Sequence, residues 1–191
     1  MSPRIRITTL RSVRFATLAA AVAVAAPGAV DAQVRLERVR ISAAHSAEAD
    51  ALTKRAVALH GRPGEYRRAA TLHMRAANLR MPGDPKAYYD LNTAAHLYRT
   101  VGNVWRAREV MERAAEHAAA RGDVVAAAMS YVDAGYLALE ARHTDRVPAL
   151  ALKAELLAES PLISEEQRSS IRNRVGYSEV VAMIPRQAAP R

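Results

Sequence analysis

The sequence lacks cysteine altogether and is poor in aromatic residues, which make up only 5% of its 191 positions. Without cysteine the chain can form no disulfide, no thiol nucleophile and no cysteine-bound metal site. A core with one Phe and one Trp has to be assembled from Ala, Leu, Val, Met and a few Tyr. Because such side chains suit closely packed helices better than a sheet, the composition predicts an all-α fold.

Lysine is scarce as well, since only Lys54, Lys86 and Lys153 occur and almost all the positive charge is arginine. What the chain does contain is 50% apolar and 25% charged residues. This is the composition of a folded protein and not of a disordered chain. The length suits one ordinary domain with its own core.

Residues 1–32 have the features of a cleaved secretion signal. Four arginines precede the apolar run FATLAAAVAVAA, and the small residues around Val30-Asp31-Ala32 suit a cleavage site before Gln33. The run covers about 12 residues, whereas a helix that crosses a bilayer needs roughly 20. We therefore expect an exported protein, periplasmic or extracellular, with no transmembrane segment after cleavage.

Loss of this leader lowers the net charge. Taking four of 28 basic and one of 19 acidic residues leaves 24 and 18, so that +9 becomes +6. A basic exported protein can make peripheral contact with an anionic envelope surface. The charges are scattered through the predicted helices, so we expect no nucleic-acid partner.

Proline, glycine and capping residues divide the rest of the chain into helices. Asp84 with Pro85, Asp123, and the capping box Ser164-Glu165-Glu166-Gln167 are helix starts. The predicted helices cover residues 47–60, 65–80, 85–101, 104 to about 120, 124–141, 145–160 and 165–175. A linker at 33–45, which has no helical stripe, and a loose tail at 177–191 flank the predicted domain at 46–176.

Small residues recur in register along these helices. Gly64, Ala69 and Ala76 recur 38 residues later as Gly102, Ala107 and Ala114, and Ala94-Ala95 recur 40 residues later as Ala134-Gly135. The interval inside each helix pair is constant, from Ala56 to Ala69, Ala94 to Ala107 and Ala134 to Val147. Small residues let two helix backbones approach closely where they cross. An ordinary Ala-rich helical bundle with accidental periodicity is the alternative.

This pattern resembles the tetratricopeptide repeat (TPR) family of helix-turn-helix repeats. The middle pair carries the resemblance best, through Leu91, Ala94-Ala95, Tyr98, Gly102, Ala107, Met111 and Ala114. The third pair has Arg142-His143-Thr144 in place of the turn glycine, and the closing Pro is displaced or missing throughout. The resemblance implies a short right-handed α-solenoid of about three repeats with a C-terminal capping helix.

No motif for catalysis or for a cofactor is present. The chain has no Gly-x-Ser-x-Gly, no phosphate-cradling glycine loop and no His-Glu-x-x-His, and its six histidines never form a His-x-x-x-His pair. We therefore expect a protein that is not an enzyme and binds no metal or cofactor.

The resemblance implies a binding groove lined by the first helix of each pair. The residues that it places there as partner-binding are Lys54, Tyr89, Asn92, His96, Arg99, Asp133 and Tyr136. Their mixture of aromatic, amide and charged groups suits a peptide or a partner helix. One TPR subgroup grips a C-terminal carboxylate, but only Lys54 agrees among the five matching positions Lys54, Ala58, Thr93, Met129 and Asp133.

The expected function is accordingly a non-catalytic scaffold or adaptor for a protein or peptide partner. The alternative is a small-ligand or metal-binding helical protein of the cell envelope that uses His60, His73 and His96.

Overall fold

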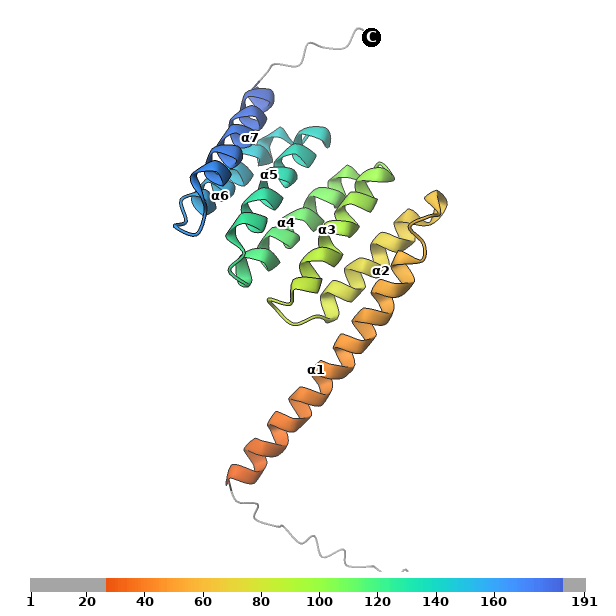
Figure 1. Cartoon of the computed structure of the whole chain (residues 1–191). Helices are drawn as coiled ribbons and strands as arrows, with labels where there is room; N and C mark the ends of the chain where they lie inside the picture. The colour runs from red at the N-terminus through yellow and green to blue at the C-terminus, as the bar shows by residue number, and fades with distance from the viewer. Residues whose placement is uncertain (1–26, 184–191) are drawn as a thin grey trace, which may run out of the picture. The chain divides into compact units, whose positions relative to one another are not determined.

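The computed structural model describes residues 27–183, and every element within that range is helical (Figure 1). The α-helices are α1 (Pro27–Val57), α2 (Tyr66–Leu79), α3 (Pro85–Thr100), α4 (Val104–Ala120), α5 (Val124–Glu140), α6 (Val147–Ala158) and α7 (Glu165–Met183). The 3₁₀ turns η1 (Pro63–Glu65) and η2 (Thr144–Arg146) precede α2 and α6. The all-α prediction is confirmed for this part of the chain.

The chain divides into two units, residues 1–37 and residues 38–191, and each is described by itself. Of the first unit the structure describes residues 27–37, which are helical. The predicted leader therefore lies mostly outside the described residues. Among helices of the described range, none combines the length and apolarity needed to cross a bilayer.

Two segments that were predicted to be irregular are helical instead. Residues 33–45 belong to α1, so the prediction of an irregular linker is wrong. This segment has no Gly or Pro and is rich in good helix formers, which allow a helix without an apolar stripe. Residues 177–183, expected in the tail, extend α7 past Gly176 because Val175 and Ser178 on either side are buried.

Side-chain caps confirm three of the predicted helix starts, whereas the helix predicted to begin at residue 47 is part of α1, which begins at Pro27. Asp84 accepts a hydrogen bond from the Lys86 amide at 2.8 Å, and Asp123 accepts one from the Ala126 amide at 3.0 Å. In the capping box, the Ser164 amide donates to Gln167 Oε1 at 2.9 Å and the Gln167 amide donates to Ser164 Oγ at 3.2 Å. These bonds satisfy amides that the first helical turn leaves without partners.

Three helix connections share one left-handed backbone position. Gly102 and Gly122 have φ angles of 74° and 79°, and Arg142 has a φ angle of 65°. The turn that lacks glycine in the third predicted pair is thus built in the same conformation with an arginine. A non-glycine residue is strained there, because its Cβ crowds the following carbonyl oxygen.

Helices that follow one another in the chain pack side by side from α2 through α7, and α7 also packs against α5. Polar contacts join alternate helices. Lys86 of α3 reaches Asp50 of α1 at 3.1 Å, Arg99 of α3 reaches Glu140 of α5 at 2.8 Å, and Arg174 of α7 pairs with Asp133 of α5. The helices α1, α3, α5 and α7 therefore share one surface, called here the odd-helix face.

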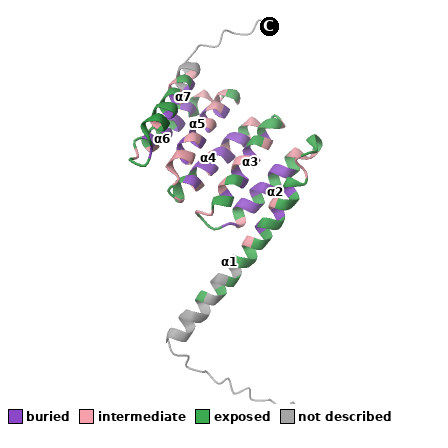
Figure 2. Ribbon diagram, in the orientation of Figure 1, coloured by how far each residue is buried: buried purple, intermediate pink, exposed green. Residues whose placement is uncertain are grey.

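The buried residues recur every 20 positions in most of the array. Figure 2 marks the buried residues in purple along the helices. One such series is Ala49, Ala69, Ala87, Ala107, Ala127 and Val147, and another is Ala56, Ala76, Ala94, Ala114, Ala134 and Ala154. Only the step from α2 to α3 is shorter, at 18. Each repeat of 38 or 40 residues found in the sequence is therefore the sum of two steps from one helix to the next, 18 and 20 in the first case and 20 and 20 in the second.

Candidate functional site

Four of the seven predicted partner-binding residues line one pocket of the odd-helix face. His96 and Arg99 come from α3, Asp133 and Tyr136 come from α5, and Arg174 of α7 closes the site. Ala95, Met111 and Leu137 supply the apolar part of the lining. The pocket measures about 240 Å³, just below the range of roughly 300 to 1,000 Å³ of small-molecule sites. A volume of this size has room for one or two side chains.

Arg174 is the site residue that the sequence did not single out. Its guanidinium pairs with Asp133, lies 5.5 Å from the Tyr136 ring centroid, and places Nη1 3.7 Å from Met129 Sδ. The Tyr136 hydroxyl donates to the Arg174 carbonyl oxygen at 3.1 Å. Arg174 is one of several arginines on α7, and no local pattern distinguishes it, because its role depends on how α7 packs against α5.

Lys54 and Tyr89 lie in a different pocket, between α1 and α3, together with Asp50, Thr53, Arg80, Lys86 and Asp90. Tyr89 is 63% exposed, so its ring is available to a partner. Asn92 lines neither pocket, and its Nδ2 lies 3.8 Å from Met111 Sδ on α4. The predicted residues thus separate into two groups on the odd-helix face. Asn92 belongs to neither group, and its side chain contacts α4.

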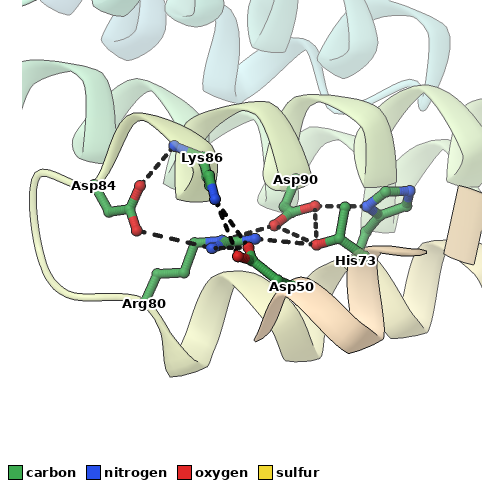
Figure 3. Close-up of polar contacts among 7 residues, drawn as sticks. Asp50, His73, Arg80, Asp84, Lys86 and Asp90 are labelled. Atoms are coloured by element: carbon green, nitrogen blue, oxygen red, sulfur yellow. Dashed lines mark hydrogen bonds and ion pairs between the residues drawn. The ribbon is translucent and has the colours of Figure 1, made fainter. Parts of the chain in front are cut away.

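A buried polar cluster lies beneath the α1–α3 pocket (Figure 3). Asp90 of α3 accepts hydrogen bonds from His73 Nδ1 at 2.7 Å, from Arg80 Nε at 3.0 Å and from Thr53 Oγ1 at 2.9 Å. The side chains of Asp90, His73 and Arg80 are at most 4% exposed. A carboxylate removed from water in this way needs its donors, because an unpaired buried charge is very costly.

Arg80 extends this cluster to the surface. Its Nη1 donates to Asp50 at 2.9 Å, and Lys86 Nζ reaches the same carboxylate at 3.1 Å. The ammonium of Lys86 and the guanidinium of Arg80 lower the pKa of Asp50. The cluster joins α1, α2 and α3, and so fixes the helices that carry Lys54 and Tyr89.

His60 continues the cluster in the other direction, with its Nε2 2.9 Å from Nε2 of His73. Because a carboxylate only accepts, His73 donates to Asp90 through a proton on Nδ1. Burial, followed by the neighbouring His73, lowers the pKa of His60. The arrangement therefore keeps His60 neutral near neutral pH.

The three histidines of the metal-binding alternative do not converge. His60 and His73 meet between α1 and α2, whereas His96 lines the pocket between α3, α5 and α7. In the part of the chain that the structure describes, no three His, Asp or Glu side chains are grouped as metal ligands. His60, His73 and His96 therefore do not form one site in this structure.

Comparison with family models, with curated proteins and with solved structures finds no match to this chain.

Proposed function

We propose that this protein is a non-catalytic scaffold or adaptor of the TPR-like type, which holds a peptide or a partner helix on its odd-helix face. The observation that supports this most is the pocket in which His96, Arg99, Asp133, Tyr136 and Arg174 from three alternate helices meet over an apolar floor. A surface with an apolar anchor site and a charged rim is the usual composition of a peptide-binding groove.

The chemistry of the pocket indicates what a partner would present. The lining from Ala95, Met111 and Leu137 suits one aliphatic side chain. Arg99 is 58% exposed and bonds through Nε to Glu140, which leaves its terminal nitrogens for a carboxylate of the partner. The proposed ligand is therefore a segment with an aliphatic residue next to an acidic one.

The test uses the double variant His96→Ala/Arg99→Ala, because both residues are exposed and belong to the rim. Capture of the native partner from an envelope extract should weaken at least tenfold, which corresponds to about 1.4 kcal/mol. The matched control is Arg40→Ala/His45→Ala, which removes the same residue types from exposed positions of α1. Equal capture by both variants would place the binding surface elsewhere.

Export is part of the proposal and is supported by the basic, apolar and small-residue segments of the leader. The proposed cut before Gln33 lies inside α1, so the mature protein would begin within that helix. Determining the N-terminal residue of protein recovered outside the cytoplasm tests this. An intact Met1 there would contradict it.

A further inference from the structure

The net positive charge of the expected mature protein, residues 33–191, equals that of one helical hairpin. Residues 51–80 contain seven basic side chains and one acidic side chain, Glu65, which gives +6. The other residues of 33–191 have 17 basic and 17 acidic side chains and are therefore balanced. Arg80 is buried and paired with Asp50 and Asp90, so the unpaired excess lies on the other basic residues at the end of α1, in the following turn and on α2.

Four of these basic residues surround one open groove between α1 and α2. Arg55 comes from α1, and Arg67, Arg68 and Arg75 come from α2, with Gly64, Thr71 and Leu72 completing the lining. All four arginines are exposed. From Arg67 to Arg75 the row spans about 12 Å along the helix, at 1.5 Å per residue. We call these four residues the arginine patch.

The arginine patch is almost free of internal ion pairs. Glu65 lies 3.7 Å from Arg68 Nη1, and this is the one acidic contact to the patch among the described residues. The buried side of α2 is meanwhile occupied by core residues such as Ala69, Met74 and Ala77, so the arginines do not serve the packing. Guanidinium groups left without carboxylates are available to bind external phosphates.

We propose that the arginine patch docks the protein on anionic phospholipid headgroups at a membrane surface. The groove is an open row of charges and not an enclosed pocket, so it suits a plane of many phosphates better than one phosphate. No aromatic side chain lines it, whereas surfaces that bind single-stranded nucleic acid stack bases on aromatic rings. Clusters of four or more basic residues on an amphipathic helix are typical of binding to anionic lipid.

The inference does not depend on the pocket lined by His96, Arg99 and Tyr136, because no residue of the arginine patch lines that pocket. Docking through α1 and α2 would leave His96, Arg99 and Tyr136 open to a partner. The protein would then present its peptide-binding groove at a membrane surface.

The first experiment measures binding of the full chain to phosphatidylcholine vesicles with and without about 30% phosphatidylglycerol, an anionic lipid. The variant Arg67→Gln/Arg75→Gln should bind anionic vesicles about 30-fold more weakly, since each surface arginine contributes about 1 kcal/mol and 1.4 kcal/mol is a factor of ten. The control Arg142→Gln/Arg146→Gln removes the same charge from another exposed site and should bind like the unaltered chain.

The second experiment reports on the patch directly, whatever the leader contributes to vesicle binding. Because the chain has no cysteine, Gly64→Cys provides a unique labelling site in the patch, where an added Cβ meets no atom within 4 Å. A fluorophore there should be quenched by anionic vesicles that carry a quencher lipid. The same fluorophore on Ser169→Cys, an exposed position of α7, should not be quenched.

Four results would overturn the proposal. The first is equal quenching at the two labelled positions, and the second is an equal loss of vesicle binding in both arginine variants. The third is tighter binding to a single-stranded oligonucleotide than to vesicles at the same salt concentration. The fourth is release from vesicles by inorganic phosphate where sodium chloride of equal ionic strength has no effect. The last two would indicate a nucleic-acid surface and a single-phosphate site respectively.

Discussion

The junction of α1, α2 and α3 and the stack from α3 to α6 are held together in different ways. The first depends on Asp90, Arg80 and His73, which are buried and bonded to one another. The second depends on alanines such as Ala95 and Ala107, which are at most 1% exposed and belong to the larger apolar core. Buried charges need one specific set of partners, whereas alanine contacts depend on volume alone.

The apolar core divides into two clusters at α2. Leu52 and Ala56 of α1 pack with Leu72 and Ala76 of α2 in a small cluster of their own. The other side of α2, including Met74, joins the larger core that continues to α7. The small α1–α2 cluster has little apolar area, so the polar cluster beside it contributes much of the specificity with which α1 docks.

The largest expected effect is at Asp90. Replacing it with Ala leaves Arg80 and His73 buried without their carboxylate, which should lower the free energy of unfolding by about 3 to 5 kcal/mol. Urea denaturation measures this. Asp145→Ala, at an exposed position, is the control and should change stability little. A small effect of Asp90→Ala would show that the two regions do not differ as described.

The stack from α3 to α6 should instead be sensitive to added volume. Ala95→Leu or Ala107→Leu should lower the free energy of unfolding by about 1 to 3 kcal/mol, because the crossing helices cannot move apart without losing other contacts. Ala119→Leu places the same side chain at an exposed position of α4 and should be tolerated. Thermal unfolding of the three variants is the measurement. Equal tolerance at all three positions would contradict the assignment of the crossing points.

The pH dependence of unfolding should report on His60, which lies against the buried polar cluster of the first region. Burial and His73 lower the pKa of His60 below its ordinary value near 6.5, so the unfolded chain binds the proton more tightly. Stability from this group is complete above about pH 6.5 and is lost as the pH falls through the lower folded-state value.

The comparison of unaltered chain and His60→Gln isolates this contribution. Denaturation curves between pH 7 and pH 5 should show a shallower loss of stability in the variant, which no longer titrates at this position. Burial also lowers the pKa of His117 on α4, so some acid sensitivity should remain. Parallel pH profiles would mean that His60 has the same pKa in the folded and unfolded chains.

The smallest effect concerns the turns of the stack. Arg142→Gly should stabilise the protein by about 1 kcal/mol, because its φ of 65° is strained for any residue with a Cβ. Gly122→Ala should destabilise it by a similar amount, since Gly122 has a φ of 79°. Opposite shifts in the midpoint of urea denaturation are expected. Shifts in the same direction would argue against equivalent turns.

The sequence by itself determined the local features of this protein. Asp84, Asp123 and Ser164 start helices where predicted, because a cap needs only a side chain and an amide two or three residues away. The recurrence of alanines likewise reports helix crossings, since a small side chain at such a position permits close approach wherever the partner lies. The continuation of α1 through 33–45 was missed because that segment has no apolar stripe.

The tertiary structure alone decided which distant side chains meet. Asp90 and Arg80 carry no signal in the sequence, and His73 stood out only as a candidate metal ligand. The three become one cluster only when α1, α2 and α3 are packed together. Arg174 joins Asp133 and Tyr136 for the same reason, because α7 returns to lie against α5 and not only against its neighbour α6. Long-range electrostatic contacts depend on the three-dimensional distance between charges, and sequence spacing does not report that distance.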